Sequence, residues 1–444
     1  MSPTLDTPLE VGGLRLRNRL YRAPLLEHAG NGPDAAERLV AELRPAAASG
    51  AGLVMQGATP IRGYEGCAAP GMTHFDDPER VASMRRLTDA VHAHGGHVFC
   101  QLAHGGLRSF EVWHHEHREA HPDLTQRAVS RPPWVIRAFD AAGVLSFDVE
   151  VLDTEAVYEL AAEFCERAAW AEAAGYDGIH LAGANMSLFH QFLSPLYNRR
   201  DDEFGGSPAG RTRFFEVVHE AIRDRTDLPV VTKVPVETDA PRFLPHVGWD
   251  EGVAACERLA ALGYDALVPV RTTPFWDASI IKGAVPDRAW ADASLEPRLA
   301  RAFGGPLRFR LVRALSRASA RRHGFEAAWN ADLCRAVRER VDVPVFCVGG
   351  LRDRAEMDAL LGDACDAVGV GRPFYAEPRL PARLLAGDAR AVCASCNNCV
   401  VPQAAGLPGT CRIPSVVAER LELERAGAYG RSEATADGGT EESG

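Results

Sequence analysis

The chain has 444 residues, a net charge of −11 at neutral pH and an ordinary hydrophobic content of 46%. The excess of acidic residues argues against a nucleic-acid-binding protein. No apolar run reaches the roughly 18 residues that a membrane-spanning helix needs. The N-terminus has neither the basic nor the apolar region of a secretory signal peptide. We therefore expect a large soluble enzyme with no nucleic-acid or membrane partner.

Cysteine and lysine usage adds to this expectation. Of the eleven cysteines, seven are scattered through stretches such as VPVFCVGG, which is typical of buried free thiols. We therefore expect a cytoplasmic protein in a reducing environment. Lysine is rare, since only Lys233 and Lys282 occur beside 47 arginines. A lysine at a special position is thus informative.

Short apolar segments rich in strand formers alternate with longer amphipathic ones. The segment EAVYELAAEFCERAAWAEAAG has a helical repeat of apolar residues and ends at a glycine. Such alternation predicts an α/β fold, a parallel (β/α)8 TIM barrel. A doubly wound open sheet is the competing interpretation, but no G-x-G-x-x-G follows the first strand. The eight expected strands are 20–25, 52–57, 97–102, 177–182, 229–234, 265–270, 343–348 and 366–370.

Two connections are unusually long, residues 103–149 and 271–327. Insertions of this kind are expected on the catalytic face of a barrel. The first contains WHHEHREAH, for which a solvated loop is favoured over a metal or substrate site. The last residues are small, polar and acidic, which is typical of disorder. We predict a barrel domain over 1–385, a cysteine segment over 386–415, and a helix end with a disordered tail over 416–444.

Four cysteines near the C-terminus follow the spacing C-x2-C-x2-C-x11-C. Three thiolates so close in sequence can surround one compact centre, and the fourth returns after a short Pro/Gly loop. All-sulfur ligation suits an iron–sulfur cluster or tetrahedral zinc, and only the cluster is redox-active. The cluster is favoured because the rest of the chain has the pattern of a redox enzyme, with zinc and unliganded thiols as alternatives. The expected ligands are Cys393, Cys396, Cys399 and Cys411.

Glycines end the last two expected strands, as Gly349-Gly350 and Gly371-Arg372. Glycines let backbone N–H groups approach a phosphate closely, and the loops after strands seven and eight are the usual phosphate site of this barrel. Arg372 adds a positive charge. Ordinary tight turns between strand and helix are the alternative.

Five segments carry a more specific resemblance: LRNRLYRAP ending at Pro24, QLAHGG at 101–106, GANMSLFHQFLSPLYNRRDDEFGGSPAGRTRF at 183–214, VGGL at 348–351 and VGVGRP at 368–373. Together they resemble the old yellow enzyme family of FMN-dependent barrels, and more closely its branch of 2,4-dienoyl-CoA reductase and trimethylamine dehydrogenase. The cysteine spacing resembles the cluster motif of that branch. The resemblance covers about residues 7–415. It implies FMN, covalent or not, at the barrel mouth and a [4Fe–4S] cluster beside it.

The resemblance also implies roles for single residues. Ala23, Pro24 and Ala58 would line the flavin, and Gln101 would hydrogen-bond its pyrimidine edge. Lys233 stands where the family usually has arginine, near flavin N1 and O2, where a cation stabilises the anionic reduced flavin. The phosphate would be held by Gly349, Gly350, Gly371 and Arg372.

The end of the fourth strand departs from the family pattern. Ala182 and Asn185 occupy two positions that usually hold a histidine and then Asn or His, which bind the substrate carbonyl. Ser187 stands where a tyrosine often donates the proton. Leu26 replaces a usual Thr or Cys that tunes the flavin. Of this set, only Asn185 is an expected catalytic residue.

Other titratable side chains lie nearby in sequence. Glu27 and His28 are the expected catalytic candidates, because an imidazole that titrates near neutrality can act as acid or base. A rim position is the alternative for His28. His190 is a further candidate, whereas His180 is expected to be a core residue of the fourth strand.

We expect an FMN- and [4Fe–4S]-dependent oxidoreductase that exchanges hydride between flavin N5 and a small organic substrate. The first hypothesis is reduction of an activated C=C bond or its reverse. The alternatives are oxidative dehydrogenation or amine oxidation, with electrons leaving through the cluster, and a non-catalytic flavin electron carrier. The chain ends about thirty residues after Cys411, so we expect no nucleotide-binding region here. NAD(P)H or a separate electron-transfer protein would then be the redox partner, and a homo-oligomer is an open alternative.

Overall fold

The computed structural model describes residues 3–109, 114–141, 148–275, 277–387 and 389–430. Its central sheet has eight parallel strands in the order β10-β9-β8-β5-β4-β3-β12-β11. A bridge between Leu267 and Val345 joins the two ends of this sheet and closes it. The expected TIM barrel is confirmed, and each expected strand segment overlaps one of these strands. They are β3 (Leu20–Arg22), β4 (Leu53–Pro60), β5 (His97–Ala103), β8 (Gly178–Leu181), β9 (Val230–Val236), β10 (Ala266–Arg271), β11 (Phe346–Val348) and β12 (Ala367–Val370).

The barrel strands are almost entirely buried, which explains their nearly continuous apolar sequences. Inward-facing side chains such as Tyr21, Phe99 and Phe346 form one apolar cluster. A second and larger cluster fills the space between the strands and the helices. Gly369 makes room for the interior, because a Cβ there would lie 2.2 Å from the Tyr21 ring. The barrel is therefore a packed core whose chemistry must lie at its ends.

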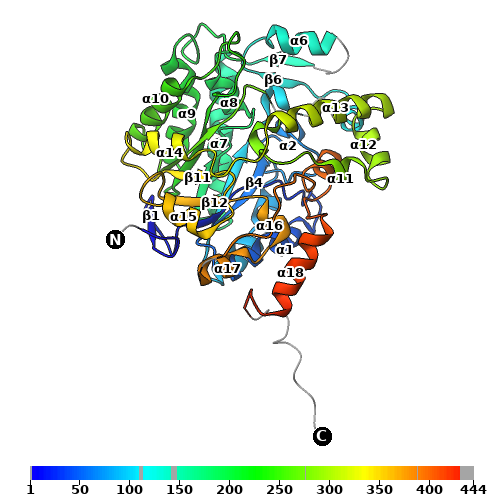
Figure 1. Ribbon diagram of the computed structural model, residues 1–444. Coiled ribbons are helices and arrows are strands. Elements are labelled where there is room, and N and C mark those ends of the chain that lie inside the picture. Colours follow the sequence, from blue (N-terminus) through cyan, green and yellow to red (C-terminus); the bar gives the residue numbers. More distant parts are fainter. Residues whose placement is uncertain (1–2, 110–113, 142–147, 276, 388, 431–444) are drawn as a thin grey trace.

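Helices surround the strands, as Figure 1 shows. The expected helix after Asp153 begins there because the Asp153 carboxylate accepts a hydrogen bond from the Ala156 N–H at 2.8 Å. None of the helices in the described ranges is long and apolar enough to span a membrane. The surrounding helices are α1 (Ala35–Ala48), α3 (Pro78–Ser83), α4 (Arg85–His92), α7 (Thr154–Ala173), α9 (Pro208–Arg223), α10 (Trp249–Ala261), α14 (Ala331–Arg338), α15 (Arg354–Leu360) and α17 (Leu380–Ala386).

The remaining elements lie outside the ring of strands. A short hairpin of β1 and β2 precedes the barrel, and β6 and β7 pair in parallel within the first long connection. These elements are β1 (Leu9–Val11), β2 (Leu14–Leu16), α2 (Gly63–Gly66), η1 (Gly106–Arg108), α5 (His115–Ala120), β6 (Gln126–Ala128), α6 (Trp134–Ala141), β7 (Val149–Val151), α8 (Leu188–Leu193), η2 (Ala278–Ile281), α11 (Asp287–Trp290), α12 (Glu296–Ala302), α13 (Pro306–Arg322), α16 (Pro373–Ala376), η3 (Val401–Ala405) and α18 (Pro414–Arg425).

The second long connection packs on the cysteine segment. Trp290, Phe303 and Phe309 from α11 to α13 form an apolar cluster that also contains Val401. The Ala289 N–H donates to the Asn398 side chain at 2.8 Å. The segment is thus joined to an insertion that precedes it by about a hundred residues. The three-part division expected from the sequence stays a prediction, and the expected tail at 431–444 lies outside the described residues.

Three histidines are buried beneath the loops at the C-terminal ends of β3 and β5. They are His28, His104 and His114, and burial lowers the pKa of His28 to about 4 and those of His104 and His114 to about 3. His114 is the buried member of the histidine-rich stretch, whose residues 115–121 are at least partly exposed. Within residues 114–121, the described part of the stretch, His114 is therefore buried and the other side chains lie at the surface.

These histidines predict a loss of stability in mild acid. Unfolded histidines bind protons below about pH 6.5, whereas the buried ones stay neutral down to about pH 4 or lower, so acid favours the unfolded chain. Each buried histidine then lowers the free energy of unfolding by about 2 kcal/mol between pH 7.5 and pH 5.0. Denaturant unfolding at the two pH values measures the difference.

Two variants test whether the buried histidines cause this difference in stability. His114→Leu should shrink the difference between the two pH values by about 2 kcal/mol, whereas His246→Leu, at a partly exposed histidine, should leave it nearly unchanged. Equal stability of the unaltered protein at pH 7.5 and pH 5.0 would contradict the prediction.

Candidate active site at the barrel mouth

A cavity of about 170 Å³ opens at the C-terminal ends of the barrel strands. This is the end at which TIM-barrel enzymes carry out their chemistry. We call it the mouth cavity. It brings together eight of the residues expected from the sequence, which come from the ends of β3, β8, β9, β11 and β12. They are Ala23, Pro24, Asn185, Lys233, Gly349, Gly350, Gly371 and Arg372.

Two of the glycines are required by the turn that they form. Gly349 and Gly350 have φ angles of 125° and 73°, which favour glycine. A Cβ on Gly350 would also lie 2.2 Å from the backbone oxygen of Glu326. The tight turn and the phosphate site are thus compatible explanations. The backbone of this turn lines the mouth cavity, so the turn has the position that a phosphate cradle requires.

Lys233 supplies a cation to the same cavity. Burial lowers its pKa to about 8, so its ammonium is still mostly protonated at pH 7. Within the described part of the chain, no hydrogen bond or ion pair engages this ammonium. A half-buried cation without a counter-charge fits a bound group that carries or develops negative charge.

Gln101 and His180 lie side by side in the barrel. The Gln101 side-chain amide is 2.8 Å from His180 Nδ1, and Nε2 of the same imidazole is buried without a hydrogen-bond partner. Burial, followed by the nearby Lys233 charge, lowers the His180 pKa well below its usual value. His180 is a buried strand residue, as expected. Its pairing with Gln101 was not predicted, although both residues are polar and lie on neighbouring strands, a signal that could have suggested it.

The loop after β8 is built differently from a proton-donating loop. Asn185 and Met186 have φ angles near 60°, and Arg108 donates to the Asn185 backbone oxygen. The Ser187 hydroxyl donates to the Ala182 backbone oxygen. Because Ser187 is occupied within its own loop, it does not replace the proton donor that a tyrosine would supply there.

His190 supports this loop from behind. Its Nδ1 accepts a hydrogen bond from the Met186 N–H at 3.0 Å, and its Nε2 lies 3.0 Å from Glu237. Both side chains are fully buried. Because Nδ1 accepts, the proton is on Nε2 and points to the carboxylate. His190 therefore positions the loop and does not reach the mouth cavity.

Glu27 and His28 lie apart from the mouth cavity. They line a separate small cavity together with Ala58. Glu27 pairs with the buried Arg22 at 2.8 Å, and burial raises the Glu27 pKa while Arg22 opposes the rise. His28 Nδ1 lies 2.6 Å from the Pro70 backbone oxygen, and its Nε2 is buried without a partner. The catalytic roles of Glu27 and His28, and the flavin contact of Ala58, stay predictions.

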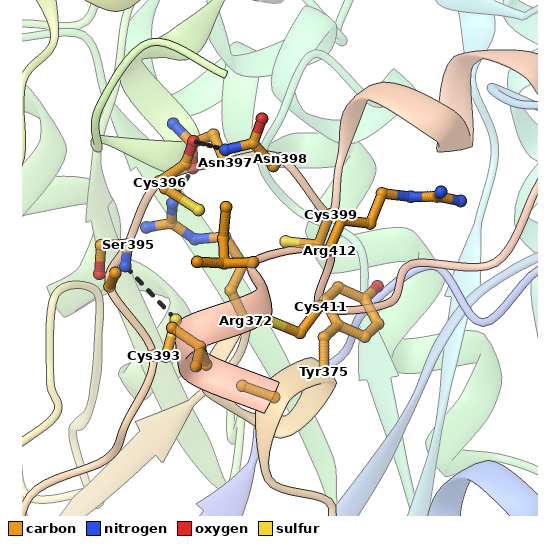
Figure 2. Close-up of a pocket in the computed structure, with 14 residues that line it drawn as sticks. Arg372, Tyr375, Cys393, Ser395, Cys396, Asn397, Asn398, Cys399, Cys411 and Arg412 are labelled. Atoms are coloured by element: carbon orange, nitrogen blue, oxygen red, sulfur yellow. Dashed lines mark hydrogen bonds between the residues drawn. The ribbon is translucent and has the colours of Figure 1, made fainter. Parts of the chain in front are cut away.

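The four clustered cysteines line a second cavity, which Figure 2 shows. We call it the cysteine cavity. All four are free thiols. The loop that carries the first three turns sharply, because Ser395 and Asn397 have φ angles of 51° and 60°. The Ser395 N–H points to Cys393 Sγ at 3.4 Å. The four expected ligands are Cys393, Cys396, Cys399 and Cys411.

The spacing of these thiols bears on what they could bind. No three His, Cys, Asp or Glu side chains in the described ranges are grouped so that they could hold a single metal ion. A tetrahedral zinc site would need such a group. A four-iron cluster binds each thiolate through a different iron, so its ligands stand farther apart. An iron–sulfur cluster stays the prediction for these four thiols, with zinc as the alternative.

Two residues line both cavities. Arg372 and Ser395 lie between the barrel mouth and the four cysteines. The Arg372 guanidinium donates to the Asn397 side-chain oxygen and, at 2.8 Å, to the Lys282 backbone oxygen. The mouth cavity and the cysteine cavity thus share the part of their walls that these two residues form.

Curated relatives cover most of this chain at low identity. The metal reductase of Desulforamulus reducens is 27% identical over 405 residues, which are 89% of this chain and 51% of that protein. The cinnamate reductase of Clostridium sporogenes is 25% identical, over 89% and 55%. The dimethylamine dehydrogenase of a Hyphomicrobium species is 26% identical, over 92% and 49%. The chain thus spans about half the length of these relatives.

Solved structures share the fold. The histamine dehydrogenase of Rhizobium sp. 4-9 superposes with a TM-score of 0.70 at 21% identity, over 94% of this chain and 53% of that one. An old yellow enzyme homologue from Zymomonas mobilis superposes with a TM-score of 0.60 at 18% identity, over 94% and 99%. Residues 4–294 match the NADH:flavin oxidoreductase / NADH oxidase family. The chain is therefore a member of that family of FMN-type oxidoreductases, and the resemblance to old yellow enzymes is confirmed.

Proposed function

We propose that the protein is an FMN- and [4Fe–4S]-dependent oxidoreductase that exchanges hydride with a small organic substrate. The observation that carries this proposal is the pair of adjoining cavities that share Arg372 and Ser395. One has the glycine turns and the cation that suit a flavin nucleotide, and the other has four thiols. The electron donor or acceptor would be NAD(P)H or a separate electron-transfer protein.

The residues of the mouth cavity fit FMN. Gly349, Gly350 and Gly371 would offer backbone N–H groups to the phosphate, and Arg372 would add a charge. Ala23 and Pro24 would lie against the ring system. Lys233 would hold its ammonium beside the pyrimidine edge and stabilise negative charge there. When bound, FMN supplies a hydride-accepting and hydride-donating nitrogen.

The loop after β8 influences which direction the reaction favours. Ala182 offers no group to polarise a substrate carbonyl, and the Ser187 hydroxyl is held by the Ala182 backbone. Asn185 is the polar side chain from this loop that lines the mouth cavity. Reduction of a simple enone needs a proton donor and a polarised carbonyl, so these two substitutions disfavour it. A substrate that brings its own polarity would depend on them less.

Oxidation is the second candidate direction. The tight contact of His28 Nδ1 with the Pro70 backbone oxygen places the Nδ1 proton on that oxygen, which leaves Nε2 as an acceptor. With a pKa of about 4, the imidazole is neutral at pH 7 and suits a base more than an acid. The relatives named dimethylamine dehydrogenase and histamine dehydrogenase are consistent with an oxidative reaction. A flavin electron carrier without substrate turnover is the third alternative.

The first test concerns FMN itself. Purified protein should show flavin absorption bands and release FMN on denaturation. Lys233→Met removes the cation from the mouth cavity and should disfavour the reduced flavin about tenfold relative to the oxidised flavin. A dye-linked redox titration measures this ratio.

The second lysine gives a matched control. The Lys282 ammonium is paired with Glu326 at 2.7 Å, and Lys282 does not line the mouth cavity. Lys282→Met should leave the flavin potential nearly unchanged. A colourless protein that binds no added FMN would remove the core of the proposal.

The four cysteines should bind about four irons and four sulfides per chain after anaerobic reconstitution. Cys399→Ala should lose most of the iron and keep FMN, because Cys399 lies outside the mouth cavity. Cys256→Ala, at a buried thiol elsewhere in the core, should keep both. One zinc per chain without iron, or equal loss of iron and FMN in Cys399→Ala, would show that the segment is structural.

Turnover of generic enones such as cyclohexenone should be poor. A missing general acid costs about 10²–10⁴-fold in rate, and the missing carbonyl contacts cost more. We expect activity on a substrate with its own polarity, with Glu27 or His28 moving the proton. Steady-state rates of the unaltered protein and of His28→Ala are compared as a function of pH.

The pH dependence of the rate and the effect of His28→Ala distinguish the possible outcomes. If His28 acts as the base, the rate falls as the pH drops through about 4, and His28→Ala is slow at every pH. Rapid cyclohexenone reduction that His28→Ala leaves unchanged would mean that the assignment of the β8 loop or the role of His28 is wrong.

A further inference from the structure

Arg372 is held firmly between the two cavities. It follows β12 and precedes α16. One guanidinium nitrogen donates to Asn397 in the cysteine loop, and the other donates to the Lys282 backbone oxygen at 2.8 Å. Because both terminal nitrogens are hydrogen-bonded, the planar guanidinium has little freedom to rotate. Its charge therefore has a fixed position relative to the thiols.

The packing around Arg372 leaves its side chain no room to move away from the cysteine loop. A Cβ on Gly283 would lie 2.3 Å from the Ser395 backbone oxygen and 3.0 Å from an Arg372 nitrogen. The Ala284 N–H donates to the same Ser395 oxygen at 3.0 Å. The second long connection thus packs the cysteine loop against the guanidinium. Only a glycine fits at position 283.

The Arg372 guanidinium lies within electrostatic reach of the thiols. Burial lowers the Arg372 pKa, and Cys393, Cys399 and Cys396 oppose that effect in this order. The guanidinium remains protonated at any ordinary pH. Arg352 also contacts the cysteine loop, through the Cys393 backbone oxygen at 2.9 Å, and its guanidinium lies over the Phe325 ring. Of the two, Arg372 is the one that lines the cysteine cavity.

We propose that Arg372 raises the reduction potential of the cluster bound by the four cysteines, and so favours electron transfer from the mouth cavity to the cluster. This inference rests on the proposed function. Gaining one electron makes the cluster one unit more negative, and no bond is made or broken. A fixed cation at its edge stabilises that extra charge, and the low dielectric of the site increases the effect. Arg372 acts here as a positioning residue for charge, in addition to any contact with a phosphate.

The test is a redox titration followed by the electron paramagnetic resonance signal of the reduced cluster, with dithionite and mediators supplying the electron. Arg372→Gln should lower the ratio of reduced to oxidised cluster about tenfold at a given solution potential, which is 59 mV for a one-electron couple. Arg372→Lys keeps the charge but withdraws it from the loop, so it should lower the ratio about threefold.

The control is Arg271→Gln. Arg271 lines the mouth cavity but not the cysteine cavity, so the same loss of charge there should leave the cluster potential nearly unchanged. Iron is assayed first in every protein. If Arg372→Gln loses its iron, the cluster potential of Arg372→Lys decides whether the inference holds.

Equal cluster potentials in the unaltered protein and in the Arg372 variant that keeps its iron would overturn the inference. An equal shift in Arg271→Gln would also overturn it, because the effect would then be a general one of cavity charge. An unaltered protein that binds no iron after reconstitution would overturn both this inference and the cluster part of the proposed function, whereas a cluster whose potential ignores Arg372 would overturn the inference alone.

Discussion

In a closed barrel of eight parallel strands, the C-terminal ends of all the strands lie at the same end of the barrel. They therefore surround one shared space. In this protein that constraint gathers residues as far apart in sequence as Ala23 and Pro373 around a single cavity. The glycine turn after β11 and the cation on β9 reach this cavity through the barrel topology alone. They line the same cavity, although β10 lies between β9 and β11 in the barrel. Barrel closure therefore creates the site, and the loops only modify it.

A second constraint acts outside the barrel. The cysteine segment follows α17, and the insertion after β10 contributes Trp290, Phe303 and Phe309 to a common apolar cluster with Val401. Tyr375 adds a further connection, because its hydroxyl lies 3.1 Å from the Leu26 backbone oxygen and 2.8 Å from Gln403. The four thiols are thereby held against the barrel mouth. In the proposed function each cavity holds a redox group, and this packing would keep the two groups close together, as rapid electron transfer requires.

Much of this arrangement could be predicted from the sequence. Alternating apolar and amphipathic segments predicted all eight barrel strands, since strand burial on both faces leaves a clear pattern. The residues at strand ends, such as Asn185 and Lys233, were found because topology alone carries them to the mouth. Glu27 and His28 could not be placed in this way. They follow β3 in sequence, but the chain turns at a left-handed His28, and Glu27 is held by Arg22.

Contacts between distant segments were also beyond the sequence. Nothing in the spacing of the cysteines predicts that Gly283 and Ser395 touch, or that Arg372 lies between two cavities. His190 looked like a titratable candidate, but its partner Glu237 comes from the far end of β9. Such pairs depend on how loops of different strands pack, and that packing is decided by three-dimensional complementarity with no periodic signal in the chain.

The central claim is that one chain holds two redox groups side by side. Its most direct measurement is the number of electrons that the reconstituted protein takes up in an anaerobic dithionite titration. The account predicts three electrons per chain, two entering a flavin and one entering an iron–sulfur cluster. An uptake of two electrons with a flavin spectrum alone would contradict it, because the four cysteines would then hold no redox centre.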